Sequence, residues 1–510
     1  MNLVQTVEWA VIAPPVIAAV AAVAVLVADL FLPAARKALL GWGAAAALAL
    51  AAFALLPLRD GDRTTFCLPD DPELCSYVAD RFAVTVQLLV LGGAFLAALL
   101  SIPETEDGEM PGGEFWFLLL SSAAGAALLP AARDLATLII ALEVTTLPAY
   151  ALVGLRRGGG AGPEAALKFF LSSVTATAVG LLGVSFVYAG SGSLYLDGIA
   201  AGLPDADPRL ATLAEAGVAL TLVAFAFKTA AVPFHFWVPE TYVGAPLPVA
   251  GYLSVVGKTA GIAGLILVTT GAFPGYGDLW GPVTGVLAGL TMTAGNVAAL
   301  RTDPEAPHSA VRLLAWSSIG QAGYLLVPVA AAAYATDTIG TAVAYALMYG
   351  VVNLGAFAVA AHVARQRSAH RLADYRGLYA RQPAAALALA FFLLCLAGLP
   401  PGVIGLFAKV AVFETAVDAD LGVLAVVMAV NVVIALYYYL RWTAYLFQRP
   451  AADGAAVSEP AADGAAVSEP AAARWPAVPL TGAIGLAALT GVVLSGAPQI
   501  ILTFASGTLF

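Results

Sequence analysis

The chain has 510 residues, of which 61% are hydrophobic and 11% are charged, and its formal net charge is −10. Soluble domains carry roughly 25% charged residues, so a chain this apolar is expected to be a polytopic membrane protein rather than a water-soluble one. The charges lie mainly in the polar connections between apolar runs, and they do not form the basic face that a nucleic-acid-binding protein needs.

Apolar runs that are long enough to cross a bilayer, about 20 residues each, recur along the whole chain. Their backbone groups find no water in lipid, so each run is expected to be a helix. We predict an all-α polytopic membrane protein, a single integral membrane domain over 1–510, with about 14 transmembrane helices. The predicted spans are 9–32, 38–57, 82–102, 115–131, 134–153, 166–189, 211–232, 247–270, 281–300, 312–333, 339–362, 384–414, 421–446 and 477–497.

The first run follows Glu8 rather than a basic segment and is long enough to span, so no cleavable signal peptide is expected. Lysine and arginine are enriched in alternate connections, and this bias marks the cytoplasmic side of a membrane. The basic set contains Arg36, Lys37, Arg156, Arg157, Arg301, Arg312, Arg365, Arg367, Arg371, Arg376, Arg381, Arg449 and Arg474, and the opposite set contains Arg59, Arg63, Arg81, Arg133 and Arg209. Both termini are therefore expected on the outer face of a bacterial inner membrane.

Three connections have distinctive compositions. Cys67 and Cys75 share an outer connection, where they either form a disulfide in an oxidising compartment or remain free thiols. An acidic cytoplasmic loop is predicted at 103–114. A cytoplasmic linker at 447–476 contains the decapeptide AADGAAVSEP twice, and its small and polar residues predict disorder. The cysteines and histidines do not have the spacing of a metal site, so no metal, haem or iron–sulfur cluster is expected in this chain.

The spans from the fourth to the thirteenth divide into two sets of five, helices 4–8 and helices 9–13. An odd number of crossings reverses the direction of the second set, as an inverted repeat requires. Helix 7 contains Pro233 soon after Lys228, and helix 12 contains Pro400, Pro401 and Gly402 ahead of Lys409. We predict that helices 7 and 12 are discontinuous, because paired broken helices in two halves of a membrane protein indicate a transport site near the bilayer midplane.

Four ionisable residues lie within apolar runs: Glu143, Lys228, Lys258 and Lys409. Such residues are costly in a membrane and usually functional, although structural pairs are the alternative. A buried lysine shifts its pKa readily, whereas an arginine stays charged. A lysine with a movable carboxylate partner can therefore bind and release a proton, and Glu143 is the obvious partner for Lys228.

Two further candidates have simpler alternatives. Lys168 lies near the start of a span and could extend its ammonium group to the interface. His235, within PFHFW, could relay protons or could only end a broken helix. The stretch GYLSVVGKT resembles a phosphate-binding loop, but it has five residues rather than four between its glycines and lies in a membrane helix, so we reject nucleotide binding.

Three longer stretches resemble a known family: FKTAAVPFHFWVPETYVGAPLPVAGYLSVVGK, RLLAWSSIGQAGYLL and LAGLPPGVIGLFAKVAVF. They are similar to the antiporter-like subunits of respiratory complex I and of Mrp-type cation/proton antiporters. The stretch ALEVTTLPAYALVGLRR and the lysine at position 409 are most similar to the subunit N type of NADH-quinone oxidoreductase. The resemblance covers nearly the whole chain.

This resemblance implies a non-redox, proton-translocating subunit without a catalytic site of its own. Flavin, iron–sulfur clusters and quinone would lie in partner subunits, and the other membrane subunits of complex I, including antiporter-like paralogues, would be its neighbours in the bilayer. Alternatives are an independent secondary transporter, a Mrp-type antiporter subunit and a subunit of a membrane-bound hydrogenase.

The resemblance also implies roles for individual residues. Glu143 and Lys228 would be a charged pair, Lys258 a central relay and Lys409 the site of the second half. The polar axis would also be lined by Lys168, His235 and Tyr438. The family often has histidine and lysine where this chain has Gln321 and Val311. Neither of these can carry a proton, so a relay through the tenth helix would use water.

Overall fold

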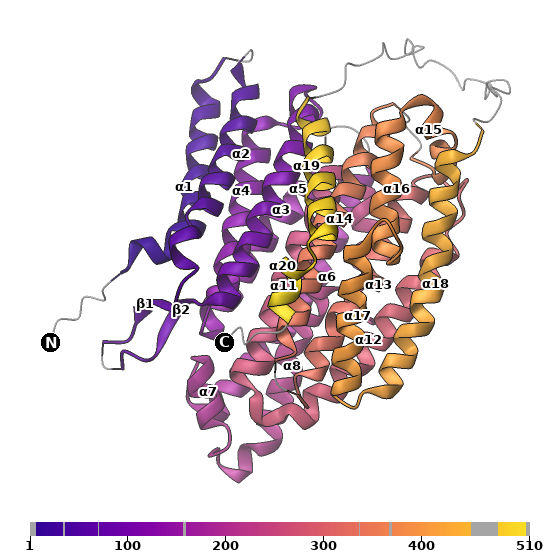
Figure 1. Cartoon of the computed structure of the whole chain (residues 1–510). Coiled ribbons are helices and arrows are strands. Elements are labelled where there is room, and N and C mark those ends of the chain that lie inside the picture. Colours follow the sequence, from indigo (N-terminus) through magenta and orange to yellow (C-terminus); the bar gives the residue numbers. More distant parts are fainter. Residues whose placement is uncertain are drawn as a thin grey trace.

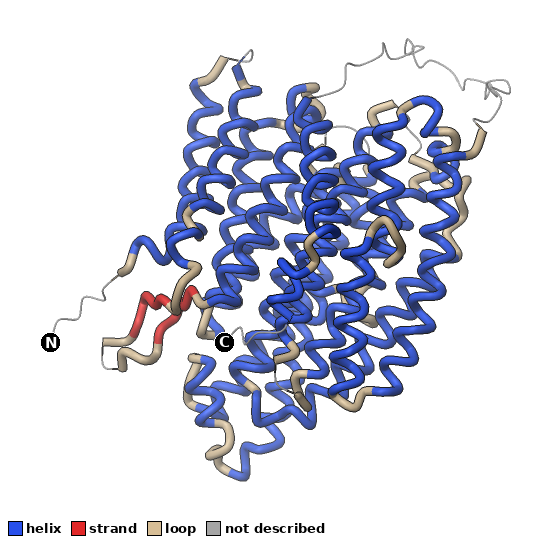
Figure 2. Tube along the Cα trace, viewed as in Figure 1, coloured by secondary structure: helices blue, strands red, loops and turns tan. Residues whose placement is uncertain are grey.

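A computed structural model describes residues 7–33, 36–69, 71–156, 160–335, 337–366, 370–449 and 478–505. The described chain is a bundle of helices that mostly run along one direction (Figure 1). A two-stranded hairpin is the one sheet among the described residues, and it lies at one end of the bundle (Figure 2). The predicted all-α membrane fold is confirmed.

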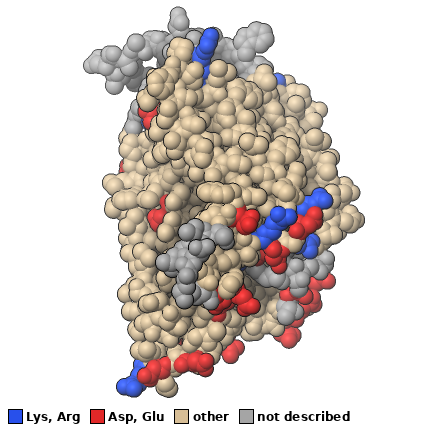
Figure 3. Space-filling model, turned by 90° about the vertical axis from the view of Figure 1, so that its left-hand side faces the viewer, with Lys and Arg blue, Asp and Glu red and all other residues tan. Residues whose placement is uncertain are grey.

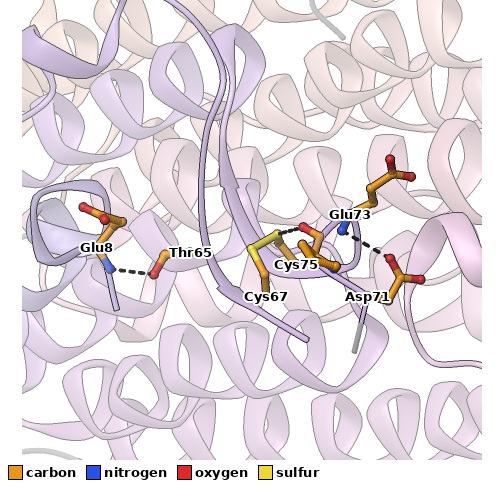
Figure 4. Close-up of a disulfide and its surroundings, with 7 residues drawn as sticks. Glu8, Thr65, Cys67, Asp71, Glu73 and Cys75 are labelled. Atoms are coloured by element: carbon orange, nitrogen blue, oxygen red, sulfur yellow. Dashed lines mark hydrogen bonds between the residues drawn. A yellow bond between two sulfur atoms is a disulfide. The ribbon is translucent and has the colours of Figure 1, made fainter. Parts of the chain in front are cut away.

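The chain begins with three helices and the hairpin. The helices are α1 (Trp9–Phe31), α2 (Ala38–Phe53, followed by the 3₁₀ turn η2, Leu56–Leu58) and α3 (Arg81–Glu106). The strands β1 (Arg63–Cys67) and β2 (Cys75–Ala79) pair antiparallel between α2 and α3, with Cys67 opposite Cys75. These two cysteines form a disulfide across the hairpin (Figure 4), which resolves the two alternatives that the sequence left open.

The hairpin joins the first helices to the connections of the next set. The backbone N–H of Arg133 donates to the carbonyl of Ser76 at 2.9 Å, and the carbonyl of Arg133 accepts from Leu196 at 2.9 Å. The Arg133 side chain forms a buried ion pair with Asp80, which also caps α3 by accepting from the Ala83 amide at 2.7 Å. The connections of helices 4–8 at this end of the bundle are therefore hydrogen-bonded to the disulfide-linked hairpin.

The first set of five spans follows the predicted order. Its members are α4 (Gly112–Leu128, followed by η3, Leu129–Ala131), α5 (Leu135–Gly154), α6 (Ala161–Ser191), α8 (Ala211–Thr229) with α9 (Trp237–Gly244), and a long composite helix. The composite helix consists of α10 (Leu247–Tyr252), the π-helical turn η5 (Leu253–Gly257), α11 (Lys258–Ile266) and a second π-helical turn, η6 (Leu267–Ala272). The short elements α7 (Leu196–Gly202) and η4 (Pro208–Leu210) connect α6 to α8.

The second set begins with η7 (Pro274–Tyr276) and comprises α12 (Gly277–Leu300), α13 (Ser309–Ala331), α14 (Ile339–Ala364), α16 (Pro383–Ala397) with α17 (Val403–Asp418), and α18 (Gly422–Phe447). The elements η8 (Leu372–Tyr375) and α15 (Leu378–Arg381) precede α16, and α19 (Val478–Gly496) and α20 (Gln499–Ala505) end the described chain. The described residues contain 13 helices that are individually long and apolar enough to span. The predicted span 384–414 is instead the pair α16 and α17, so the predicted break in helix 12 accounts for the difference from fourteen.

Both predicted breaks are present, and they have the same form. Helix α8 ends at Ala230, whose backbone is left-handed with φ 62°, and helix α16 ends at Gly398, with φ 84°. A left-handed residue after the last helical turn redirects the chain and stops the helix. The inverted five-helix sets therefore each contain one helix that ends within the bundle.

The connections differ in extent from the prediction. Residues 103–106 continue α3 and residues 112–114 begin α4, so the acidic connection that lies outside helices is 107–111. In the linker predicted at 447–476, α18 includes Phe447, and residues 450–477, with both decapeptide copies, lie outside the described part of the chain, as do Arg157, Arg367 and Arg474.

The outer surface of the bundle is mostly apolar. Side chains such as Val423, Val426, Val433 and Leu181 are exposed along α18 and α6, whereas nearly every residue of α13 is buried at the centre. On the side shown in Figure 3, most charged side chains gather in the lower half, toward the end that carries the hairpin. An apolar surface around a buried polar centre is the arrangement expected in a bilayer.

Candidate functional site

Lys228 lies at the end of α8, directly before the first helix break, and its side chain is buried. Its ammonium group donates to the hydroxyl of Ser173 at 2.5 Å and to the hydroxyl of Tyr150 at 3.3 Å. Tyr150 in turn donates to Ser173 at 2.5 Å. The first buried lysine is therefore surrounded by side-chain hydroxyl groups from α5 and α6.

Glu143, in the middle of α5, is half-buried and does not contact Lys228 directly. Its carboxylate accepts a hydrogen bond from Thr177 of α6 at 2.7 Å. Among the residues that the structure describes, no ion pair joins Glu143 to Lys228. The predicted partners thus lie near one another through α6, but they are separated in this structure.

Lys258 lies where the π-helical turn η5 joins α11, and it is 1% exposed. Its ammonium group donates to the carbonyl of Ser318 at 2.6 Å and to the Ser318 hydroxyl at 2.5 Å. A π-helical turn disturbs the regular hydrogen bonds of a helix and is often found at functional sites. Here the Ser254 carbonyl, within η5, accepts from the hydroxyl of Tyr349 at 3.1 Å, and Tyr349 also bonds to Ser318 at 2.7 Å.

Lys409 lies in the second turn of α17, after the second break, and is buried. It donates to the carbonyls of Leu396 and Ala397, at 2.7 and 2.9 Å. These carbonyls belong to the last turn of α16, where a helix leaves acceptors unpaired and carries partial negative charge. The ammonium group also lies 5.5 Å from the ring centre of Tyr324. Lys409 is therefore held mainly by a helix end rather than by side chains.

A polar group of α13 lies between Lys258 and Lys409. The amide of Gln321 donates to Tyr439 at 3.0 Å and, more weakly, to the Leu396 carbonyl at 3.4 Å, and its oxygen accepts from Tyr345 at 2.5 Å. Tyr439 also bonds to Ser317 at 2.5 Å. Gln321 thus shares the Leu396 carbonyl with Lys409, and one of the two residues that depart from the family pattern lies between two lysines.

A small cavity adjoins Lys228 on the side of η5. It has a volume of about 10 Å³ and is lined by residues that include Lys228, Tyr252 and Gly257, the residue before Lys258. Ser122 also lines it and accepts from the Tyr252 hydroxyl at 2.7 Å. This volume is about that needed for one water molecule, so one water fits beside Lys228 on the side of Gly257.

The other three predicted site residues have different surroundings. Tyr438 is buried and donates to Asn296 at 2.9 Å, beside the polar group around Gln321. His235 is half-buried within the first break, and its ring centre lies 5.7 Å from that of Trp316 on α13. Lys168 is instead exposed on α6 and forms an ion pair with Glu164, one turn away, at 2.7 Å. The expectation that Lys168 lines the polar axis is corrected, because its side chain points to the outer surface.

Sequence reasoning missed the hydroxyl groups that contact Lys228, Lys258 and Glu143 or bond to Gln321 and Ser318 beside them. They are Tyr150, Ser173, Thr177, Ser318, Tyr345, Tyr349 and Tyr439. Polar residues within the runs FFLSSVTAT and ALMYGVVN were a signal, but serine and threonine commonly bond their own helix. Within the described residues, no group of three or more His, Cys, Asp or Glu side chains is placed to hold a metal ion.

A bundle with two inverted five-helix sets, one broken helix in each set and a central line of buried lysines has the organisation of an ion-translocating membrane protein. The chain belongs to the NADH:quinone oxidoreductase/Mrp antiporter transmembrane family, whose model matches residues 132–435. It is 66% identical over 510 residues to NADH-quinone oxidoreductase subunit N 2 of Streptomyces griseus, covering 100% of this chain and 95% of the relative. It is 46% identical to subunit N of Salinispora tropica, covering 88% of each chain.

Solved structures agree with this family. A chain of respiratory complex I from Thermus thermophilus is 30% identical and superposes with a TM-score of 0.74, covering 97% of this chain and 100% of that chain. A chain of the Mrp complex from Dietzia superposes with a TM-score of 0.78 over 97% of this chain and 96% of that chain, but at 22% identity this likeness shows the fold alone.

Proposed function

We propose that this chain is the antiporter-like, proton-translocating subunit N of a bacterial NADH-quinone oxidoreductase. Its full-length relatives at 66% and 46% identity have that name, whereas the Mrp chain shares the fold alone. NADH oxidation and quinone reduction take place in partner subunits, which hold the flavin, the iron–sulfur clusters and the quinone site. This chain contributes no redox step and carries protons in response to that chemistry.

The observation that supports proton transport best is the set of acceptors around the three buried lysines. Lys228, Lys258 and Lys409 each donate to neutral oxygen atoms, and none forms an ion pair with a carboxylate in the described residues. A buried charge without a counter-charge is costly, and a lysine can avoid this cost by losing its proton. Hydroxyl and carbonyl oxygens can accept from both the charged and the neutral amine, so both protonation states fit these sites.

In the proposed path, the proton is bound at Lys228, passes to Lys258 and then reaches Lys409. Glu143 raises the proton affinity of Lys228 when it approaches, and lowers it again when it withdraws to Thr177. A water molecule in the cavity beside Lys228 would bridge the first transfer. The polar group around Gln321, with water, would bridge the second, while His235 and Tyr438 shape the surroundings of the path.

We place the chain in the bacterial inner membrane with the hairpin outside. Two features support this orientation. The end of the bundle that carries most connections of the basic set corresponds to the cytoplasmic side by the distribution of positive charge. The Cys67–Cys75 disulfide lies at the opposite end, and disulfides persist in oxidising compartments outside the cytoplasm.

The test is NADH-driven proton uptake into inverted membrane vesicles that contain the assembled complex. Lys228→Met removes the charge at similar length, and Lys228→Arg keeps the charge but does not release its proton. Both should abolish most proton uptake while the complex still assembles on a native gel. Lys37→Met, which changes an exposed lysine paired with Asp29, is the matched control and should pump normally. Wild-type pumping by Lys228→Arg would contradict a proton-releasing role.

A further inference from the structure

Two hydroxyl groups of α6 differ from the others in that helix. Four serine and threonine side chains donate to the carbonyl four residues earlier, the usual behaviour in a helix interior; they are Ser172, Thr175, Ser185 and Ser191. Ser173 and Thr177 instead bond to side chains of neighbouring helices. These two hydroxyl groups are therefore directed at partners outside their own helix.

Their partners are the two members of the predicted charged pair. Ser173 accepts from Lys228 of α8 at 2.5 Å, and Thr177 donates to Glu143 of α5 at 2.7 Å. Residues four apart lie on one face of a helix, with about 5–6 Å between their Cβ atoms. Helix α6 thus holds the ammonium group and the carboxylate at two adjacent levels, one helical turn apart.

Glycine residues fix α6 closely against α8. A Cβ atom on Gly180 would lie 2.6 Å from the Cβ of Ala224, and one on Gly183 would lie 2.4 Å from the backbone nitrogen of Thr221. Small residues at such contacts let two membrane helices pack with their backbones close together. The level of Ser173 relative to Lys228 is therefore set by backbone packing, so that joining the pair would take a movement of the Glu143 side chain rather than a shift of α6 along α8.

We propose that Ser173 and Thr177 are positioning residues of the proton path, which hold Glu143 and Lys228 apart and so define the open state of the pair. This inference rests on the proposed proton-translocating function. In the open state, Thr177 satisfies one carboxylate oxygen and Ser173 satisfies the ammonium group. Closing the pair requires Glu143 to exchange the Thr177 hydroxyl for Lys228.

The hydroxyl of Thr177 therefore biases the equilibrium between the open and closed pair. Loss of one hydrogen bond to a charged group changes an equilibrium by about tenfold or more. Without this hydroxyl, Glu143 would be left with an unpaired oxygen and would move to Lys228, where it favours the protonated lysine. Release of the proton would then require a higher pH.

The groups that face Lys228 determine which of them could cause a shift in the pH dependence of pumping. They are Glu143 and Tyr150 from α5, Ser173 from α6, Phe227 from α8 and Tyr252 from α10 across the small cavity. Glu143 is the one carboxylate among them. A change in the pH dependence of pumping in a Thr177 variant would therefore report the position of Glu143.

The experiment measures NADH-driven proton uptake by the assembled complex in inverted vesicles from pH 6 to pH 9, with the rate of NADH oxidation recorded in parallel. Thr177→Val keeps the shape of the side chain and removes the hydroxyl. Thr177→Ser keeps the hydroxyl and removes the methyl group. Thr175→Val is the matched control, because Thr175 donates only to its own helix at Leu171. A native gel confirms assembly of each variant.

Thr177→Val should lower proton uptake at pH 7 by about tenfold and shift its pH dependence to higher pH, while Thr177→Ser and Thr175→Val remain near wild type. A Thr177→Val profile that matches Thr175→Val, or a failure of Thr177→Ser to rescue pumping, would overturn the inference. If Lys228→Met still abolishes pumping in that case, the proposed function stands without it. If Lys228→Met pumps normally, the proposed function itself is contradicted, and the inference about Thr177 falls with it.

Discussion

The lysines of the two five-helix sets lie beside similar helix breaks but contact different chemical groups. Lys228, before the first break, donates to the hydroxyl groups of Ser173 and Tyr150. Lys409, after the second break, donates to the backbone carbonyls of Leu396 and Ala397. The first site is built by side chains of neighbouring helices, and the second by the end of its own broken helix.

This difference has a physical consequence for each site. Hydroxyl groups both donate and accept, so they can bond to one another when the lysine is absent, as Tyr150 and Ser173 already do at 2.5 Å. Carbonyl groups only accept, so those of Leu396 and Ala397 cannot bond to each other; Lys409 donates to both, and Gln321 donates only weakly to that of Leu396. We therefore expect loss of the lysine to cost less stability at the first site than at the second.

The largest expected effects come from replacing Lys409. Lys409→Met should abolish most proton uptake and should also lower the stability of the chain by about 1–3 kcal/mol more than Lys228→Met does, because it removes the donor of the Ala397 carbonyl and leaves the Leu396 carbonyl with only the weak bond from Gln321. Lys409→Gln should recover much of that stability, since its amide can donate to a carbonyl, but it should not recover pumping. Thermal unfolding of the purified complex and proton uptake in vesicles measure the two effects separately.

Equal loss of stability for Lys228→Met and Lys409→Met would break the contrast between hydroxyl and carbonyl acceptors. Pumping by Lys409→Gln would show that this position supplies a hydrogen bond rather than a proton.

The next effect concerns the hairpin, which is fastened to the first set through Arg133. Replacing Cys67 and Cys75 by serine should destabilise the hairpin by about 2–3 kcal/mol, the value expected for a short disulfide loop. Hydrogen exchange should then rise at Leu135 and Leu196, whose amides bond within the connections beside the hairpin. The connections of the second set at the same end of the bundle should not change. Uniform exchange over both sets would show that the hairpin does not stabilise the first set selectively.

The same cysteines test the orientation. Impermeant thiol reagents should label them on intact cells after reduction and not before, because the disulfide lies on the outer face in the proposed topology.

Substitutions at the left-handed residues of the two helix breaks should have smaller effects, which differ between the two breaks. Gly398→Ala places a side chain at φ 84° and within 3.3 Å of the Lys409 side chain, and it should cost about 1–2 kcal/mol. Ala230→Gly removes a side chain from a left-handed position at φ 62° and should not destabilise the protein. The melting temperature should therefore fall for Gly398→Ala, and it should stay the same or rise for Ala230→Gly. Destabilisation by Ala230→Gly would mean that its methyl contacts matter more than its backbone conformation.

The smallest effect concerns two histidines in connections of the second set. The rings of His308 and His370 stack with centres 5.6 Å apart. Burial lowers the pKa of both, and Arg312 adds to this effect at His308; at His370, His308 and Arg156 add to it and Asp374 opposes it. A lowered histidine pKa in the folded state means that stability is present above the usual value near 6.5 and is lost as the pH falls through the folded value.

After allowance for solvent screening, this contribution should be under about 1 kcal/mol. Hydrogen-exchange protection of the Ala310 amide, which donates to the His370 carbonyl at 3.2 Å, should fall between pH 7.5 and pH 5.5. His370→Gln should reduce this pH dependence, and the remainder should come from His308. His362→Gln, at a histidine that bonds to Gln382 instead, should retain it.

The spans and breaks could be predicted because each depends on a short stretch of sequence. Pro233 and the residues 400–402 interrupt helix formation by local geometry, and the structure places breaks there. The prediction that Lys168 lines the axis was wrong, because it depended on the direction of a side chain rather than on a short stretch of sequence. A sequence shows that Lys168 lies near a helix start, but not whether its side chain points inward, and the apolar runs of α6 have no clear polar side.

The contact set of each lysine could not be predicted from local pattern. Lys228 and Tyr150 are 78 residues apart, and Lys258 and Ser318 are 60 apart. These contacts depend on which helices become neighbours and on their rotation. The separation of Glu143 from Lys228 arises in the same way, because Thr177 provides a closer donor on a third helix.

The sequence by itself determined that this is a membrane protein with two sets of spans, one broken helix in each and lysines at their centres. The physical reason is that lipid requires continuous apolar helices, so a lysine or a proline within one is conspicuous from its immediate neighbours alone. Only the tertiary structure decided what each lysine contacts. Packing of α6 against α8 brings a hydroxyl group to Lys228, and the end of α16 brings carbonyl groups to Lys409. Whether such a lysine keeps its proton depends on those atoms, and they come from distant parts of the chain.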